Sequence, residues 1–229
     1  MVAILLATAP ARAEDPPGRI VVTGRAQAEV APDFATVEVT VETRGATPAA
    51  ALDQNSSSAQ KVGALAREFG AGGPDIVTTA VMLRPATRTV REPNGSMREV
   101  PDGYQAVNAV QIRLRDLSRL GTLVRRVLET GADRIGGIGF GLADPAKAEA
   151  GIQADAVRDA RRQAEILAGA AGLRLGRIER ITTSPRDAVP PPYPMARALA
   201  AKGPAASVPV EPGAVEVSAA VEVTWMIAP

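Results

Sequence analysis

The sequence predicts an α+β fold, in which a largely antiparallel sheet carries three helices and a projecting β-hairpin. Three observations lead to this prediction. Several stretches alternate apolar and polar residues as half-buried strands do, three stretches repeat apolar residues at helical spacing, and the strands come in pairs between the helices. The expected order is β-β-α-β-β-α-β-α-β-β.

The first two strands are predicted over residues 20–30 and 35–43, because both stretches alternate apolar with polar side chains. Pro32 and Asp33 lie between them. Two strands separated by so short a turn are typical of an antiparallel hairpin.

The helices are predicted from apolar spacing and from their end residues. The first begins with Thr47 and Pro48, an N-cap followed by proline at the first helical position, and Gly70 ends it. Gly131 closes the second, and the third spans residues 146–171. The third helix should approach the sheet closely, since one face carries mostly small residues: Ala148, Ile152, Ala156, Ala160, Ala164, Leu167 and Ala171.

A long hairpin is predicted from about residue 75 to residue 114, with Asn94 and Gly95 at its tip. Few apolar residues lie between Arg84 and Pro101, so this part should project from the body. Its strand edges make it the candidate site of partner contact, although an inert hairpin is the alternative. The candidate contact residues are Arg91, Glu92, Asn94, Gly95, Met97 and Arg98.

The remaining strands follow the second and third helices. A glycine-rich strand comes first, a strand over residues 177–184 comes next, and residues 215–227 give the last. We interpret residues 185–212 as a proline-rich loop. The glycines at 136–141 resemble a phosphate-binding loop only superficially, because they fall within a strand.

Composition excludes several classes of function. Lys and Arg number 26 against 25 Asp and Glu, and aromatic residues make up 3%, which disfavours nucleic-acid binding. The chain has no Cys and no His, which removes thiol nucleophiles, Ser-His-Asp triads and the usual zinc ligands. We therefore expect a protein that is not an enzyme and holds no cofactor or metal.

The amino terminus predicts the compartment. Residues 2–9 are apolar, and Ala11-Arg12-Ala13 fits a small-x-small cleavage site, so residues 1–13 are predicted to be a signal peptide. The mature chain, residues 14–229, is expected to be one domain in the periplasm or secreted. No run of about 20 apolar residues exists, so we expect no integral membrane segment.

Short motifs in a fixed order resemble those of the SIMPL-domain family, which includes periplasmic immunogenic proteins. They are Val22-Thr23-Gly24, Ala31-Pro32-Asp33 with Ala35, the Gly72 to Thr78 turn, Gly103-Tyr104-Gln105-Ala106 with Asn108, Gly131-Ala132-Asp133, Ile138-Gly139-Phe140, the third-helix residues Ala154, Ala156, Asp159, Ala160 and Ala164, and Pro212-Gly213. Asp133 departs from the family pattern, which usually has Asn there.

The resemblance implies an α+β domain that forms homo-oligomers, with an envelope protein as a second class of partner and a link to envelope or oxidative stress. It implies no catalytic residues. Two alternatives remain open. One is an enzyme that uses the carboxylates of Asp33, Asp102 or Asp133, and the other is a peptide binder that adds a strand to a sheet edge.

Overall fold

The computed structural model describes residues 18–183 and 210–228, and it confirms the α+β fold and the predicted order of elements. The strands are β1 Arg19–Val30, β2 Phe34–Gly45, β3 Ile76–Arg91, β4 Met97–Leu114, β5 Arg134–Gly141, β6 Arg174–Thr183 and β7 Val215–Ala228. The helices are α1 Pro48–Glu68, α2 Leu120–Thr130 and α3 Pro145–Ala170. The predicted signal peptide and most of the predicted proline-rich loop lie outside the described residues.

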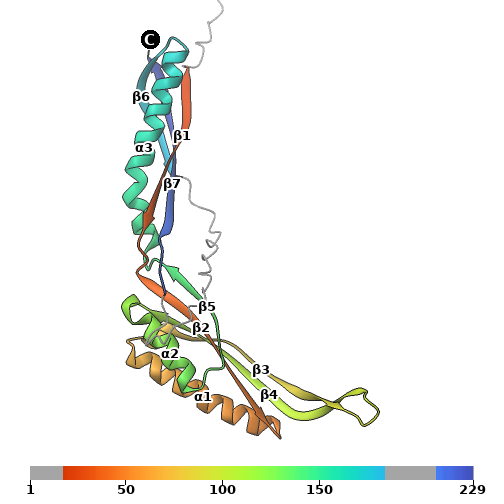
Figure 1. Cartoon of the computed structure of the whole chain (residues 1–229). Coiled ribbons are helices and arrows are strands. Elements are labelled where there is room, and N and C mark those ends of the chain that lie inside the picture. Colours follow the sequence, from red (N-terminus) through yellow and green to blue (C-terminus); the bar gives the residue numbers. More distant parts are fainter. Residues whose placement is uncertain (1–17, 184–209, 229) are drawn as a thin grey trace, which may run out of the picture. The chain divides into compact units, whose positions relative to one another are not determined.

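The strands form two antiparallel sheets rather than one, and the chain divides into two compact units (Figure 1). Unit 1 contains residues 18–28, 146–183 and 217–228, and unit 2 contains residues 29–145 and 210–216. The prediction that β1 and β2 form a hairpin is wrong, because β1 pairs with β7 and β2 pairs with β4 and β5. The turn between them is bonded to β5, because the Asp33 N–H donates to the Gly141 carbonyl (3.0 Å).

Unit 1 is a sheet of order β1-β7-β6 with α3 packed along one face. The buried side chains of β7 alternate with exposed ones as predicted: Val217, Ala219, Val221, Val223 and Trp225 face the core. Four of them, from Ala219 to Trp225, share a cluster with the buried alanines of α3 at 156, 160 and 164, and the buried Ala168 continues this alanine row. Leu167 was expected in this row but is half exposed, because the row keeps a strict spacing of four residues.

Gly24 lets α3 lie directly on β1. A Cβ placed on Gly24 would come 2.0 Å from the Ala156 carbonyl oxygen and 2.4 Å from the Ala160 backbone nitrogen. Both alanines are fully buried. The close approach that the small helix residues predicted therefore depends equally on a strand residue with no side chain.

Asp159 of α3 also forms a hydrogen bond with β1. Its Oδ2 accepts hydrogen bonds from the Arg25 backbone N–H (3.0 Å) and from Gln163 Nε2 (2.7 Å), and Oδ1 accepts one from Arg162 (2.9 Å). The hydrogen bond from the Arg25 backbone, with that from Gln163, holds the pKa of Asp159 below its ordinary value of 3.8.

Unit 2 is a sheet of order β3-β4-β2-β5 with α1 and α2 on one face (Figure 1). The helix-facing residues of β2 are Ala35, Val37, Val39 and Val41, all fully buried. Asn55 of α1 is also fully buried, and its Nδ2 donates to the carbonyls of Val41 (3.0 Å) and Ala106 (3.2 Å). This amide links α1 to both central strands.

The predicted helix ends of unit 2 are confirmed. Thr47 is the N-cap of α1, with its hydroxyl accepting from Ala50 N–H (3.2 Å), and Pro48 opens the helix. Gly131 follows α2 with a φ of 118°, a left-handed conformation that favours glycine. These ends fix where each helix turns back toward the sheet.

Gly24→Ala should destabilise unit 1 by about 3 kcal/mol, because the added methyl group has no room against the α3 backbone. Urea unfolding followed by Trp225 fluorescence measures this, since Trp225 is the only tryptophan and lies in the unit 1 core. Gly151→Ala in α3 is the matched control: its methyl would touch nothing within 4 Å, and alanine favours helix, so stability should rise slightly. Equal effects of the two substitutions would contradict the close-approach account.

The stabilisation contributed by Asp159 should vanish in acid. Because its pKa is lowered in the folded state, the contribution is complete above the unfolded pKa and is lost as pH falls through the lower folded pKa. The difference in unfolding free energy between wild type and Asp159→Ala should therefore shrink below about pH 4. A difference that stays constant from pH 6 to pH 3 would show that the carboxylate charge is irrelevant to this contact.

Candidate functional site

The predicted hairpin is formed by β3 and β4, and its tip is a tight turn. The Glu92 carbonyl accepts from Gly95 N–H (2.9 Å), and Glu92 N–H donates to the Ser96 carbonyl (2.8 Å). Gly95 has a φ of 87°, and the Asn94 side chain accepts from Ser96 N–H (2.9 Å). A turn followed by a left-handed glycine matches the twist of the two strands.

The six candidate contact residues therefore lie together at this tip. Arg91 is opposite Met97 in the register, and Arg98 forms an ion pair with Glu92 at 2.8 Å. Met97 is 68% exposed, which is unusual for so apolar a side chain. Their involvement in partner contact stays a prediction.

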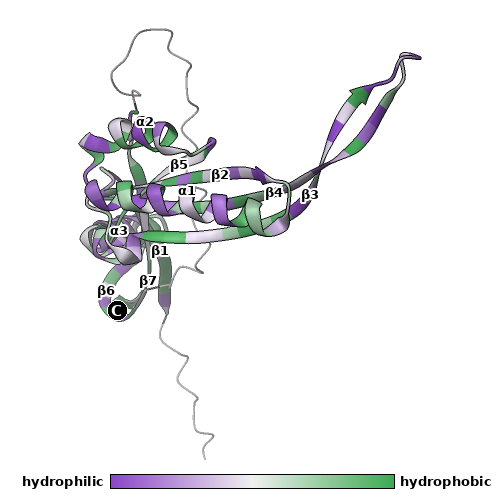
Figure 2. Ribbon diagram, turned by 90° about the horizontal axis from the view of Figure 1, so that it is seen from below, coloured by the Kyte–Doolittle hydropathy of each residue, from purple (hydrophilic) through white to green (hydrophobic). Residues whose placement is uncertain are grey.

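The hairpin departs from the rest of the sheet (Figure 2). Between Arg84 and Pro101 only Ala86 is buried, as the low apolar content of this stretch predicts. At its base, Asp102 forms ion pairs with Arg44 (3.3 Å) and Arg88 (3.5 Å). The base is thus held by charges, and the outer part has no core of its own.

β3 adds an apolar surface that the sequence analysis missed. Among the described residues β3 pairs only with β4, so one of its edges has no partner strand. Four of its apolar side chains are between 43% and 57% exposed: Val77, Val81, Met82 and Leu83. The signal was present, because residues 80–83 are four consecutive apolar residues in a stretch that should alternate.

The three candidate catalytic carboxylates serve as structural contacts and do not share a site. Asp33 Oδ1 accepts from Ala143 N–H (2.7 Å), and Asp133 Oδ2 accepts from Glu42 N–H (2.6 Å). Asp102 lies at the hairpin base. Asp33 precedes β2 while the other two lie near its far end, about 30 Å along the strand.

Two acids of α3 form ion pairs with arginines of the same helix. Asp155 pairs with Arg158 and Asp159 with Arg162, as their helical spacing predicts. Within residues 18–183 and 210–228, no three Asp or Glu side chains gather as metal ligands would.

The structure is that of an α+β protein: it has two antiparallel sheets, each with helices on one face, and a long hairpin. The chain belongs to the SIMPL family, described as a protein of unknown function (DUF541), whose model matches residues 20–225. The match covers both sheets and the hairpin.

Named relatives agree with this assignment. The chain is 26% identical over 215 residues to the 26 kDa periplasmic immunogenic proteins of Brucella melitensis biotype 1 and Brucella abortus strain S19, which covers 92% of this chain and 85% of each relative. It is 29% identical over 167 residues to the uncharacterized protein YggE of Edwardsiella ictaluri, covering 72% of this chain and 68% of that protein.

The chain is a periplasmic protein, as the sequence analysis predicted. Its described helices include none that is both long enough and apolar enough to cross a membrane. The description of the family names no molecular activity.

Asp133→Ala should speed amide hydrogen exchange at Glu42 about tenfold, because it removes the acceptor of that N–H. Asp133→Asn should leave exchange almost unchanged, since an amide oxygen can accept the same bond. Exchange measured by NMR distinguishes the two. Similar rates in all three proteins would mean that the Asp133 side chain does not protect this amide.

Proposed function

We propose that the protein is a non-enzymatic binding or scaffolding protein of the periplasm. We further propose that it self-associates through one strand edge of unit 2, which we call the association edge. This edge consists of the unpaired side of β3 together with the hairpin tip, residues 91–98. The observation that carries the proposal is the exposed apolar run on β3, which lies on a strand with free backbone groups.

A free strand edge is a template for another strand, and proteins that stay apart protect such edges with charge, proline or cover. The inner half of β3, residues 76–83, has no charged residue and no proline. Charges begin only at Arg84 and continue toward the tip. An edge that is apolar near the body and charged outward supports pairing that is driven by burial and aligned by the outer charges.

The outer part of the hairpin has little to stabilise it within its own chain. This also supports contact between the hairpin and a second chain. An isolated two-stranded ribbon is marginally stable in water, and this one has almost no buried side chain in its outer part. A second chain lying against it would supply the apolar contacts that it lacks.

The other components of the proposal rest on the family resemblance alone. These are an envelope protein as partner and a link to envelope or oxidative stress. A carboxylate enzyme is the alternative, and the structural hydrogen bonds and ion pairs of Asp33, Asp102 and Asp133 argue for the non-enzymatic role.

Two variants test the association edge. In the first, residues 89–99 are replaced by Asn-Gly, so that Arg88 and Val100, which are opposite each other, close a two-residue turn. In the second, Met82→Lys places a charge on the β3 edge. Light scattering should give the wild type a mass that is a multiple of its chain mass and should give lower masses for both variants.

Ile166→Lys is the matched control, because Ile166 on α3 is also an exposed apolar residue, at 70%. It should leave the particle mass unchanged. A monomeric wild type, or variants with the wild-type mass, would contradict self-association through this edge.

A further inference from the structure

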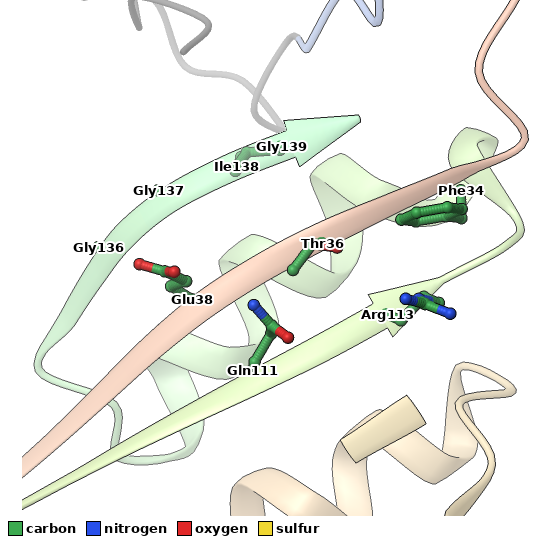
Figure 3. A pocket seen from close by; sticks show the side chains of 9 residues that line it. All are labelled: Phe34, Thr36, Glu38, Gln111, Arg113, Gly136, Gly137, Ile138 and Gly139. Carbon is green, nitrogen blue, oxygen red and sulfur yellow. The ribbon is translucent and has the colours of Figure 1, made fainter. Parts of the chain in front are cut away.

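The face of the unit 2 sheet opposite α1 and α2 carries a groove of about 310 Å³ (Figure 3). Its floor is the backbone of β5, where Gly137 is opposite Glu38 and Gly139 is opposite Thr36. Nine residues line it: Phe34, Thr36, Glu38, Gln111, Arg113, Gly136, Gly137, Ile138 and Gly139.

The glycines keep this groove open. The helix-facing side of β5 carries the apolar side chains of Ile138 and Phe140, whereas the outer side carries glycine at 137, 139 and 141. At Gly141 the Phe34 ring covers the backbone, with its Cζ 2.5 Å from where a Cβ would be. At Gly137 a Cβ would meet nothing within 4 Å. Glycine in a strand marks a place where another group approaches the backbone closely, and among the described residues none does so at Gly137.

Two opposite charges stand at the ends of the groove without pairing. Arg113 is stacked on the Phe34 ring, with its guanidinium carbon 4.4 Å from the ring centre. Glu38 lies over β5, with its Oε2 3.3 Å from where a Cβ of Gly136 would be. They occupy diagonal positions on neighbouring strands, about 7–8 Å apart at their Cα atoms. Arg113 packs on the Phe34 ring and Glu38 lies over the backbone at Gly136, so the guanidinium and the carboxylate do not pair.

Polar residues further along the same face behave differently. Glu42 accepts hydrogen bonds from Gln105 (2.8 Å) and Arg134 (3.0 Å), and Gln105 accepts from Arg84 (2.9 Å). Within the part of the chain that the structure describes, the side chains of Thr36, Glu38, Gln111 and Arg113 make no hydrogen bond or ion pair with one another or with other groups. Polar side chains of neighbouring strands therefore bond to one another around Glu42, whereas those of the groove do not.

We propose that this groove binds a short zwitterionic peptide of two or three residues. Its ammonium group pairs with Glu38 and its carboxylate pairs with Arg113. An extended peptide spans about 3.3–3.6 Å per residue, so two or three residues are on the scale of the distance between the Cα atoms of Glu38 and Arg113. The Thr36 hydroxyl and the Gln111 amide lie between them and supply hydrogen bonds to the peptide groups. This site is independent of the association edge.

Calorimetry with trialanine tests the proposal. Trialanine should bind at millimolar or lower concentration, and N-acetyl-trialanine amide, which lacks both charges, should bind at least about tenfold more weakly. Glu38→Gln and Arg113→Gln should each weaken trialanine binding by a similar factor. Glu129→Gln on α2 removes a carboxylate remote from the groove and should leave binding unchanged.

Gly137→Val provides the sharpest variant, because valine suits a strand and a Cβ at this position meets nothing within 4 Å among the described residues. It should keep the wild-type unfolding profile and lose trialanine binding. No binding of trialanine at millimolar concentration, equal binding of the capped peptide, or full binding by Gly137→Val would each overturn the proposal. The variant with the shortened hairpin should bind trialanine as wild type does, so failure of self-association and failure of this site are separate results.

Discussion

The alternation of side chains along β2 is the constraint on which unit 2 depends. Because successive residues of a strand point to opposite faces, the fully buried Val37 and Val39 fix Thr36 and Glu38 on the other face. β2 is also a central strand, bonded to both β4 and β5. Its register therefore places the core, the groove residues and the start of the long hairpin at once. A shift by one residue would bury the glutamate and expose the valines.

Strand glycines leave space over the backbone in both units, but this space is filled in unit 1 and open in unit 2. In unit 1 the space left by Gly24 is filled by the α3 backbone. In unit 2 the space over Gly137 stays open, and polar side chains surround it. A glycine in a strand leaves room for another group to approach the backbone. Only the structure shows whether another part of the protein fills that room.

The sequence predicted elements better than their partners. Thr47 with Pro48, Gly131 and Asn94 with Gly95 each act through local chemistry, and each marks the end or turn that was expected. The predicted β1–β2 hairpin failed because a Pro-Asp turn has the same local chemistry whether the chain returns to its sheet or enters another. Partner choice depended on long-range contacts, such as that between the Asp33 N–H and the Gly141 carbonyl.

Side-chain burial shows the same division. In α1 the apolar Leu52 is exposed, whereas the polar Asn55 is fully buried. Helical spacing shows only approximately which face of a helix is buried. Hydrophobicity then favours Leu52 over Asn55 as the buried residue. Asn55 is buried because two strand carbonyls accept its hydrogens, and those carbonyls come from residues 14 and 51 positions away. No local pattern encodes such a partner. The candidate groove was beyond prediction for the same reason, since it joins residues of three strands.

The two edges of the hairpin determine what kind of assembly self-association would give. If β3 pairs with β3 of a second copy, the contact is the same patch twice, and it closes into a two-fold dimer.

The outer part of β4, before Tyr104, is not paired to β2 and offers a different edge. If β3 pairs with that edge of the next copy, the two patches differ, and each added chain leaves a new free edge. Such a contact gives a ring if the rotation between copies closes and an open filament if it does not. The apolar run lies on the inner half of β3, while the free edge of β4 lies on the outer half of the hairpin. Burial of that run is the stronger driving force, so the two-fold arrangement, which can bury it on both chains, is the one this edge favours.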